Sequence, residues 1–111
     1  AVCAALVPWV MFANIQALRQ TGSEEGGQPG LTAYTEVARL LSGDPGASAE
    51  QGAQWTLALC QDLGIPGLSS HGLTLSDLPE VARQAALASS MKGNPVLLSR
   101  EDLEHILHQA L

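Results

Sequence analysis

Basic residues are scarce in this sequence. Five Lys and Arg stand against eleven Asp and Glu, which gives a formal net charge of -6. A protein that binds nucleic acid uses Lys and Arg to neutralise phosphates, and no basic stripe is available for that here. We therefore expect no nucleic-acid partner. Such an acidic excess is ordinary for a cytoplasmic protein, which is the location we expect, and it identifies no substrate.

Aromatic residues are also few, at 4% of the chain, although hydrophobic residues make up 46%. The surplus consists of Ala and Leu, which favour helices over strands. A chain of 111 residues is long enough to bury a core of its own. We therefore predict an all-α fold, a bundle of about five helices, with residues 1–111 forming a single helical domain.

Cysteine is limited to Cys3 and Cys60, which lie far apart and outside any Cys-x-x-Cys or Cys/His pattern. This spacing favours neither a zinc site nor a disulfide framework. We predict that both are buried small hydrophobic residues in a reducing compartment. A reactive thiol is the alternative, but neither cysteine has a nearby basic residue to activate it.

Charge is absent from residues 1–18, where only Pro8, Asn14 and Gln16 are not apolar. A membrane-spanning helix needs about 20 apolar residues and rarely carries both Asn and Gln. We therefore expect no membrane span. A helix that is hydrophobic on all sides is otherwise a central helix of a core. We predict such a helix over residues 2–20, with Pro8 near its first turn or at a kink.

Two helices are predicted in the next part of the chain. Residues 20–30 lack periodicity and are rich in Gly, which predicts a surface loop. A helix follows over residues 31–41, and Ser48 with Gln51 predicts a capping box at the start of the next one, which Gly64 ends. The inner faces expected are Leu31, Tyr34, Val37, Ala38 and Leu41, then Ala53, Leu57, Cys60 and Leu63, widened by Trp55 and Leu59.

The last two helices have their own start signals. Asp77 and Glu80 suit the positive end of a helix that begins near Pro79. Ser99 and Asp102 predict the cap of a final helix. The inner stripes expected are Val81, Ala82, Ala85 and Ala88 in the first, and Leu103, Ile106, Leu107 and Ala110 in the second.

Histidine and glutamate side chains on the final helix form the best local metal candidate. His105 and His108 lie three residues apart, with Glu101 and Glu104 as neighbours. All four fall on the polar side of that helix, and a catalytic metal site normally has three protein ligands. A solvated helix face is therefore the favoured interpretation.

A second candidate, His71, lies in a loop beside Ser69 and Ser70. A nucleophile and its base normally come from separate segments, so we predict a plain surface histidine. The aromatic residues of the apolar runs are predicted as core anchors: Trp9, Phe12 and Trp55. Taken by themselves, the residues predict a helical bundle and no catalytic site.

Residues 2–14 carry a more specific pattern, V-C-A-A-L-V-P-W-V-M-F-A-N. The spacing of Pro8 and Asn14 around Val10 and Met11 resembles the long helix of the iron-containing (group III) alcohol dehydrogenases, which reads roughly H-G-x-x-x-A-x-L-x-P-x-V-M-x-x-N. Matching stretches follow in the family's order at residues 34–41, 63–68, 78–82, 90–95 and 98–107. The resemblance covers the chain almost end to end, and only residues 20–30 depart from it noticeably.

The resemblance implies the helical part of a larger enzyme. Family members have an N-terminal α/β domain that holds NAD(P) and a C-terminal helical domain, of a dehydroquinate synthase-like fold, that holds iron(II). The implied reaction interconverts a small-molecule alcohol and aldehyde by hydride transfer, with iron or zinc bound by one Asp and three His. The last of these ligands would sit in a His-Gly pair just before Ala1.

We therefore expect a fragment that is inactive alone and supplies no catalytic, cofactor-binding or metal-binding residue. The chain also begins without an initiator Met or a helix cap, so we expect it to continue upstream. Within it, Ser90, Met91 and Asn94 match a family segment that approaches the substrate cleft. The alternative is a free-standing helical interaction module that binds a partner, or a second copy as a homodimer, through its exposed apolar opening helix.

Overall fold

Helices account for all regular structure in the described part of the chain. The computed structural model describes residues 2–21, 28–87 and 98–111. Within these ranges it contains five α-helices, two 3-10 turns and no strand, so the prediction of an all-α fold of about five helices is confirmed. The elements are α1 (Val2–Thr21), α2 (Gln28–Ser42), α3 (Ala49–Asp62), η1 (Leu68–His71), η2 (Leu75–Asp77), α4 (Leu78–Leu87) and α5 (Arg100–Ala110).

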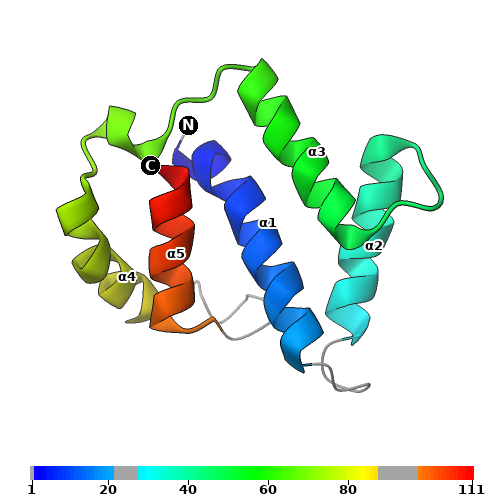
Figure 1. Cartoon of the computed structure of the whole chain (residues 1–111), viewed down its shortest axis with the longest axis horizontal. Coiled ribbons are helices and arrows are strands. Elements are labelled where there is room, and N and C mark those ends of the chain that lie inside the picture. Colours follow the sequence, from blue (N-terminus) through cyan, green and yellow to red (C-terminus); the bar gives the residue numbers. More distant parts are fainter. Residues whose placement is uncertain (1, 22–27, 88–97) are drawn as a thin grey trace.

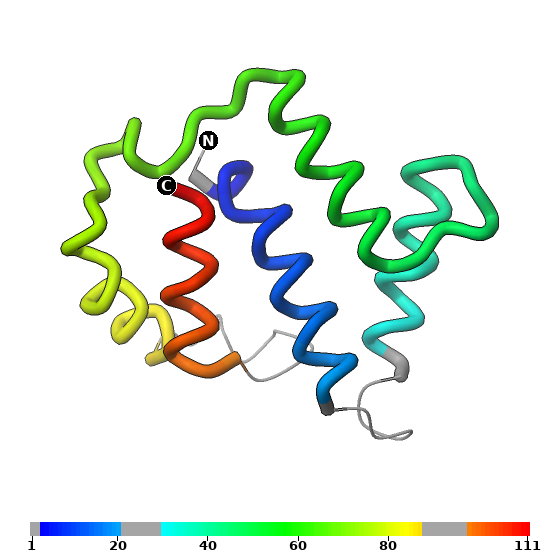
Figure 2. The backbone as a smooth tube through the Cα atoms, in the orientation of Figure 1, coloured from blue at the N-terminus to red at the C-terminus, as the bar shows by residue number. Residues whose placement is uncertain are grey.

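The opening helix α1 lies in the middle of the molecule, between α3 and α5 (Figure 1). Helix α2 packs against α3, and α4 packs against α5, so the helices form a slab of 40 × 33 × 19 Å. Figure 2 shows the start of α1 beside the end of α5. The predicted central helix is therefore confirmed, and Pro8 lies inside it, in its second turn.

On one side of α1, helices α2 and α3 meet through small residues. A Cβ added to Gly52 would lie 2.8 Å from the Cβ of Ala38 and 2.9 Å from its Cα, so the two backbones approach closely. The core beneath this contact is small. Its buried members are Ile15, Ala49 and Ala53, with Met11, Phe12, Leu31 and Tyr34 packed against them.

Helix α3 begins and ends as predicted. The Ser48 Oγ accepts the Gln51 N–H, and the Gln51 side-chain oxygen accepts the Ser48 N–H at 2.7 Å, which completes the capping box. At the other end, Gly64 has a φ of 69°, and the Ile65 N–H donates to the Cys60 carbonyl at 3.0 Å. This is the Schellman arrangement, which needs a residue that tolerates the left-handed region.

On the other side of α1, helices α4 and α5 bury larger side chains. The stripe predicted for the final helix is confirmed, because Leu103, Ile106, Leu107 and Ala110 are all buried. Ser99 and Asp102 form the predicted cap as a reciprocal capping box. The remaining buried members of this core are Ala5, Leu68, Leu78, Ala82 and Leu98.

The loop expected over residues 20–30 is shorter than predicted. Helix α1 continues to Thr21, and α2 already begins at Gln28. Pro29 falls in the first turn of α2, where a missing N–H costs no helical hydrogen bond. Residues 22–27 between the two helices lie outside the described ranges.

Several side chains predicted to be buried are exposed. Helix α3 buries its small residues Ala49, Gly52 and Ala53, which turns Trp55 and Leu59 toward solvent. On α2, Val37 and Leu41 are exposed as well, although they belong to the predicted inner face. The other exposed residues from the predicted core are Leu63 and Cys3, while Cys60 is half-buried.

No helix in the described residues combines the length and the apolar character that a membrane span requires.

Candidate functional site

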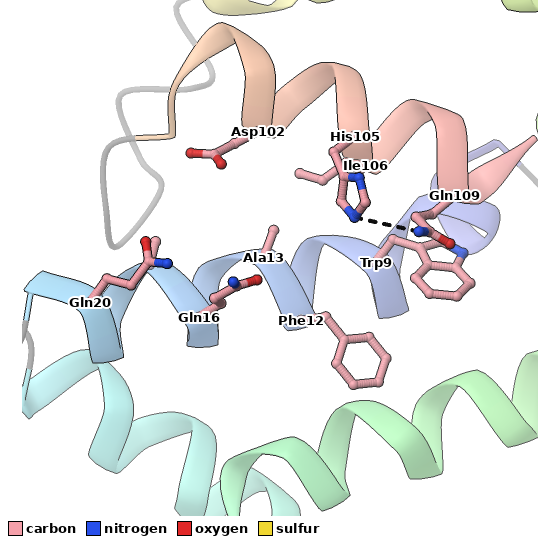
Figure 3. A pocket seen from close by; sticks show the side chains of 10 residues that line it. Trp9, Phe12, Ala13, Gln16, Gln20, Asp102, His105, Ile106 and Gln109 are labelled. Atoms are coloured by element: carbon pink, nitrogen blue, oxygen red, sulfur yellow. Dashed lines mark hydrogen bonds between the residues drawn. The ribbon is translucent and has the colours of Figure 1, made fainter.

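A groove of about 300 Å³ lies between α1 and α5 (Figure 3). Its lining combines aliphatic and aromatic side chains with amide, carboxylate and imidazole groups. A mixture of apolar side chains with a few polar groups is typical of binding sites. The lining residues are Trp9, Phe12, Ala13, Gln16, Ala17 and Gln20 of α1, and Asp102, His105, Ile106 and Gln109 of α5.

Helical spacing brings the polar side chains of this groove together. Gln16 and Gln20 are one turn apart on α1, and His105 and Gln109 are one turn apart on α5. The Nε2 atoms of His105 and Gln109 lie 3.4 Å apart, and Figure 3 shows this hydrogen bond running along α5. The groove therefore presents amides from two helices that are distant in the sequence.

Two of the three predicted aromatic anchors belong to the groove. Trp9 and Phe12 are half-buried, and their ring centroids lie 5.9 Å apart in a tilted pair. Trp55, in contrast, is 38% exposed on α3 and takes no part in this site. The anchor prediction is therefore wrong for Trp55.

The described residues of the groove offer groups suited to binding. Its carboxylate, Asp102, accepts the Ser99 N–H at 2.9 Å as part of the α5 cap. Among the described lining residues there is no hydroxyl or thiol side chain, and His105 is bonded to an amide. A nucleophile with its base, or a pair of acids, is therefore not assembled among these residues.

The predicted metal candidate lies around a second, more open depression between α4 and α5. Glu101, Glu104, His105 and His108 all contribute to its lining. Among the described residues, however, no three His, Cys, Asp or Glu side chains are grouped so that they could hold a metal ion. Glu101, His105 and His108 are exposed, which agrees with the interpretation of this face as solvated.

His71 is exposed at the end of η1 and is not assembled with a serine nucleophile. The Ser69 hydroxyl instead donates to the carbonyl oxygen of Leu111 at 2.9 Å. The Ser69 N–H donates to the same oxygen at 3.4 Å. Ser69 thus ties η1 to the end of α5, and the prediction that His71 is a surface histidine is confirmed.

The acids at the start of α4 are held in their ionised form. Arg83 and Gln84 donate to the Glu80 carboxylate, which lowers the pKa of Glu80 to about 2. The N–H and hydroxyl of Thr74 donate to Asp77 and lower the pKa of that carboxyl. A general acid or base works best with a pKa near neutrality. Both acids therefore stabilise a helix start, as their positions in the sequence predict.

The residues predicted to line a substrate cleft, Ser90, Met91 and Asn94, lie outside the described ranges, as does Ala88 of the predicted inner stripe. Their assignment stays a prediction. The groove between α1 and α5 was missed at the level of sequence. The spacing of Gln16 and Gln20 on an otherwise apolar helix is the one local signal that could have indicated it.

Comparisons with known proteins identify no family, since no protein-family model, curated protein or solved structure matches the chain.

Proposed function

We propose that this chain is the C-terminal helical domain, with a dehydroquinate synthase-like fold, of an NAD(P)-dependent, iron-containing alcohol dehydrogenase-like oxidoreductase. The ordered resemblances along the sequence support the proposal. The structural observation that carries it furthest concerns Pro8 and Asn14, the residues that make the opening pattern specific. Both are among the largest fully buried side chains of the molecule.

Burial gives each of these two residues a defined place in the packing. Asn14 is 1% exposed, and its amide Nδ2 donates to the Tyr34 Oη at 2.9 Å. A buried amide without such a partner would be costly, so its position on α1 selects the placement of α2. Residues whose buried side chains fix the packing of helices are those that proteins sharing the fold would retain.

The proposed role of this chain is structural support. The described residues do not fit a metal site, so we assign no ligand for iron(II) or zinc to them and no contact with NAD(P). Helix α1, held on both sides by α3 and α5, would fix the position of whatever precedes Ala1. The alcohol or aldehyde substrate would belong to the whole protein, with Ser90, Met91 and Asn94 as proposed lining of its cleft.

The gene sequence upstream of the codon for Ala1 tests this proposal directly. We expect a His-Gly pair immediately before Ala1, preceded by an Asp, two further His and a glycine-rich nucleotide loop. A start codon at that place would overturn the assignment.

Metal binding by the 111-residue chain gives an independent test. Metal-free protein titrated with iron(II) or zinc should bind less than one equivalent, because no three ligands meet in the described residues. One tightly held equivalent would contradict the proposal. The His105→Gln variant serves as the control, since it would lose that metal if the α5 histidines held it.

A second candidate function, a free-standing helical interaction module, is favoured by exposed apolar side chains. The sequence places that surface on the opening helix. Among the described side chains of α1, however, Val7 is the only large hydrophobic one that is exposed. In the described residues, the exposed apolar surface lies mainly on α2 and α3.

A further inference from the structure

The outer face of α2 and α3 gathers most of the exposed large hydrophobic side chains. Of nine such side chains in the described residues, six belong to these helices or to the residue that follows α3. Leu40 is 83% exposed, more than any other member of the group. The six are Val37, Leu40, Leu41, Trp55, Leu59 and Leu63.

Charge is depleted on the α3 part of this surface. Helix α3 has no charged side chain between Glu50 and Asp62, although Gln51, Gln54 and Trp55 are exposed there. On α2, Glu36 and Arg39 are the charged residues between Gln28 and Ser42. Interface cores differ from the rest of a protein surface in this depletion of charge and in their aromatic content.

Glu36 and Arg39 are exposed charges of opposite sign that lack an ion pair in the described part of the chain. They lie three residues apart, on the face of α2 that points away from Ala38 and the core. Together with Leu40 they line a shallow surface depression that continues to Gly43 and Pro45. The outward stripe of α2 therefore has an apolar centre with one charge of each sign beside it.

This stripe is complementary to itself. In a twofold arrangement, residue i of one copy meets residue j of the other, and j meets i. Two antiparallel α2 helices centred near Val37 and Ala38 would place Glu36 of each copy beside Arg39 of the other. In the same register, Val37 of each copy would lie about 3 Å along the helix axis from the level of the exposed Leu40 of the other, so that the two side chains could still touch.

We propose that a second copy of this chain docks on the outward face of α2, forming an antiparallel α2–α2 dimer. Leu40 and Val37 are its apolar centre, and two symmetric Glu36–Arg39 ion pairs set its register. The equal and opposite charges fit a second copy because each copy supplies the complement of the other. This inference is independent of the oxidoreductase assignment, and neither the gene sequence nor metal binding tests it.

Sedimentation equilibrium of the 111-residue chain, from about 1 μM to about 1 mM, tests the proposal over the range in which small interfaces dissociate. We expect a monomer–dimer equilibrium. Glu36→Arg and Arg39→Glu should each weaken self-association at least about tenfold, because both ion pairs become like-charge contacts. Leu40→Gln should weaken it as well, without loss of helical circular dichroism, since Leu40 is largely exposed.

Charge exchange separates this geometry from nonspecific association. An equimolar mixture of the Glu36→Arg and Arg39→Glu variants should form a heterodimer, since each chain then supplies both charges that the other needs. The double variant Glu36→Arg/Arg39→Glu should dimerise like the original protein. Arg100→Glu, an identical charge reversal at an exposed position on α5, is the matched control and should leave the association unchanged.

Four results would overturn the proposal. The chain could stay monomeric at the highest concentration, or the two single variants could associate as strongly as the original. The mixture of single variants could also fail to regain the dimer while both remain folded. The chain could also form higher oligomers that Leu40→Gln does not weaken. That result would mean that association does not use the outward face of α2.

Discussion

The two sides of α1 are packed in opposite ways. Toward α4 and α5, the core consists mainly of Leu and Ile side chains, with Ile106 and Leu107 among its buried members. Toward α2 and α3, the buried core is smaller: Leu31 and Tyr34 pack inward, and α2 and α3 meet each other through Gly52 and Ala38. Most of the other large apolar side chains of these two helices face solvent. One side is held mainly by apolar volume, whereas the other depends more on the close approach of the α2 and α3 backbones.

This difference explains why the apolar pattern of the sequence alone predicts the wrong buried faces for α2 and α3. A helix has one face available for a given neighbour, and the residues that permit close approach are the smallest. When α3 presents Ala49, Gly52 and Ala53 to its neighbours, Trp55 and Leu59 must point elsewhere. A surface rich in large hydrophobic residues is thus a consequence of the small-residue contact beneath it.

The largest expected effect is the loss of stability when a buried apolar side chain is removed, compared with removal of an exposed one. Ile106→Ala should lower the free energy of unfolding by about 2–5 kcal/mol, because it leaves a cavity in the larger core. Leu40→Ala, which removes a similar side chain from the exposed face, should change it by less than about 0.5 kcal/mol. Urea unfolding at low protein concentration measures both. Equal losses of unfolding free energy in the two variants would contradict the proposed difference between the buried and the exposed apolar side chains.

The close approach of α2 and α3 gives the second prediction. Gly52→Ala should destabilise the fold by about 1–3 kcal/mol, although Ala favours helices, because the new methyl group would overlap Ala38. Gly46→Ala is the control. Its added Cβ would meet only the Asp44 side chain, at 3.4 Å, so a small change is expected. A stabilised Gly52→Ala variant would show that the two helices can separate freely.

Removal of a helix cap tests whether α3 and α5, on opposite sides of α1, lose similar amounts of stability. Ser48→Ala and Ser99→Ala each remove the half of a capping box that the serine Oγ accepts and should cost about 1 kcal/mol. The Ser99 Oγ accepts the Asp102 N–H at 3.0 Å, whereas the Ser48 Oγ accepts the Gln51 N–H at 3.4 Å. We therefore expect Ser99→Ala to be the more destabilising of the two in thermal unfolding. The reverse order would indicate that packing around α3 outweighs cap geometry.

The smallest effect concerns the ion pair that joins α1 to α3. Arg19 donates to both carboxylate oxygens of Glu50, and the side chains are 47% and 39% exposed. Solvent screening limits such a pair, so Glu50→Gln should cost about 0.2–1 kcal/mol at low salt and less at high salt. Thermal unfolding at two ionic strengths measures this. A loss that does not depend on salt would indicate packing as its cause.

The same pair has a defined pH dependence. The Arg19 guanidinium lowers the pKa of Glu50 below its ordinary value of 4.5. The stabilisation is therefore complete above pH 4.5, where the unfolded chain is also ionised, and is lost as the pH falls through the lowered folded-state pKa. Denaturant titrations at successive pH values should show Glu50→Gln losing its deficit relative to the original protein in acid. A deficit that persists there would contradict the assignment.

Local signals predicted the helices well. Ser48 with Gln51 and Ser99 with Asp102 located two helix starts, and Gly64 located one end, because caps and left-handed glycines depend on a few neighbouring residues. The stripe of the final helix was also predicted, since its large apolar residues all face a single core.

Properties that depend on neighbouring helices were predicted less well. Periodicity marks Val37 and Leu41 as apolar positions, but it cannot reveal that α3 approaches through Gly52 and leaves them uncovered. The groove between α1 and α5 was missed for a similar reason. Its polar groups come from Gln16 and Gln20 on one helix and His105 and Gln109 on another, nearly a full chain length apart.

The contact between Gly52 and Ala38 should also have left a trace in evolution. Because a Cβ at position 52 would lie 2.9 Å from the Cα of Ala38, the clash would persist even with glycine at position 38. Descendants of a common ancestor that keep this crossing should therefore keep glycine at position 52. A set of such sequences would show an unchanged glycine there, while neighbouring exposed positions such as Gln54 vary freely.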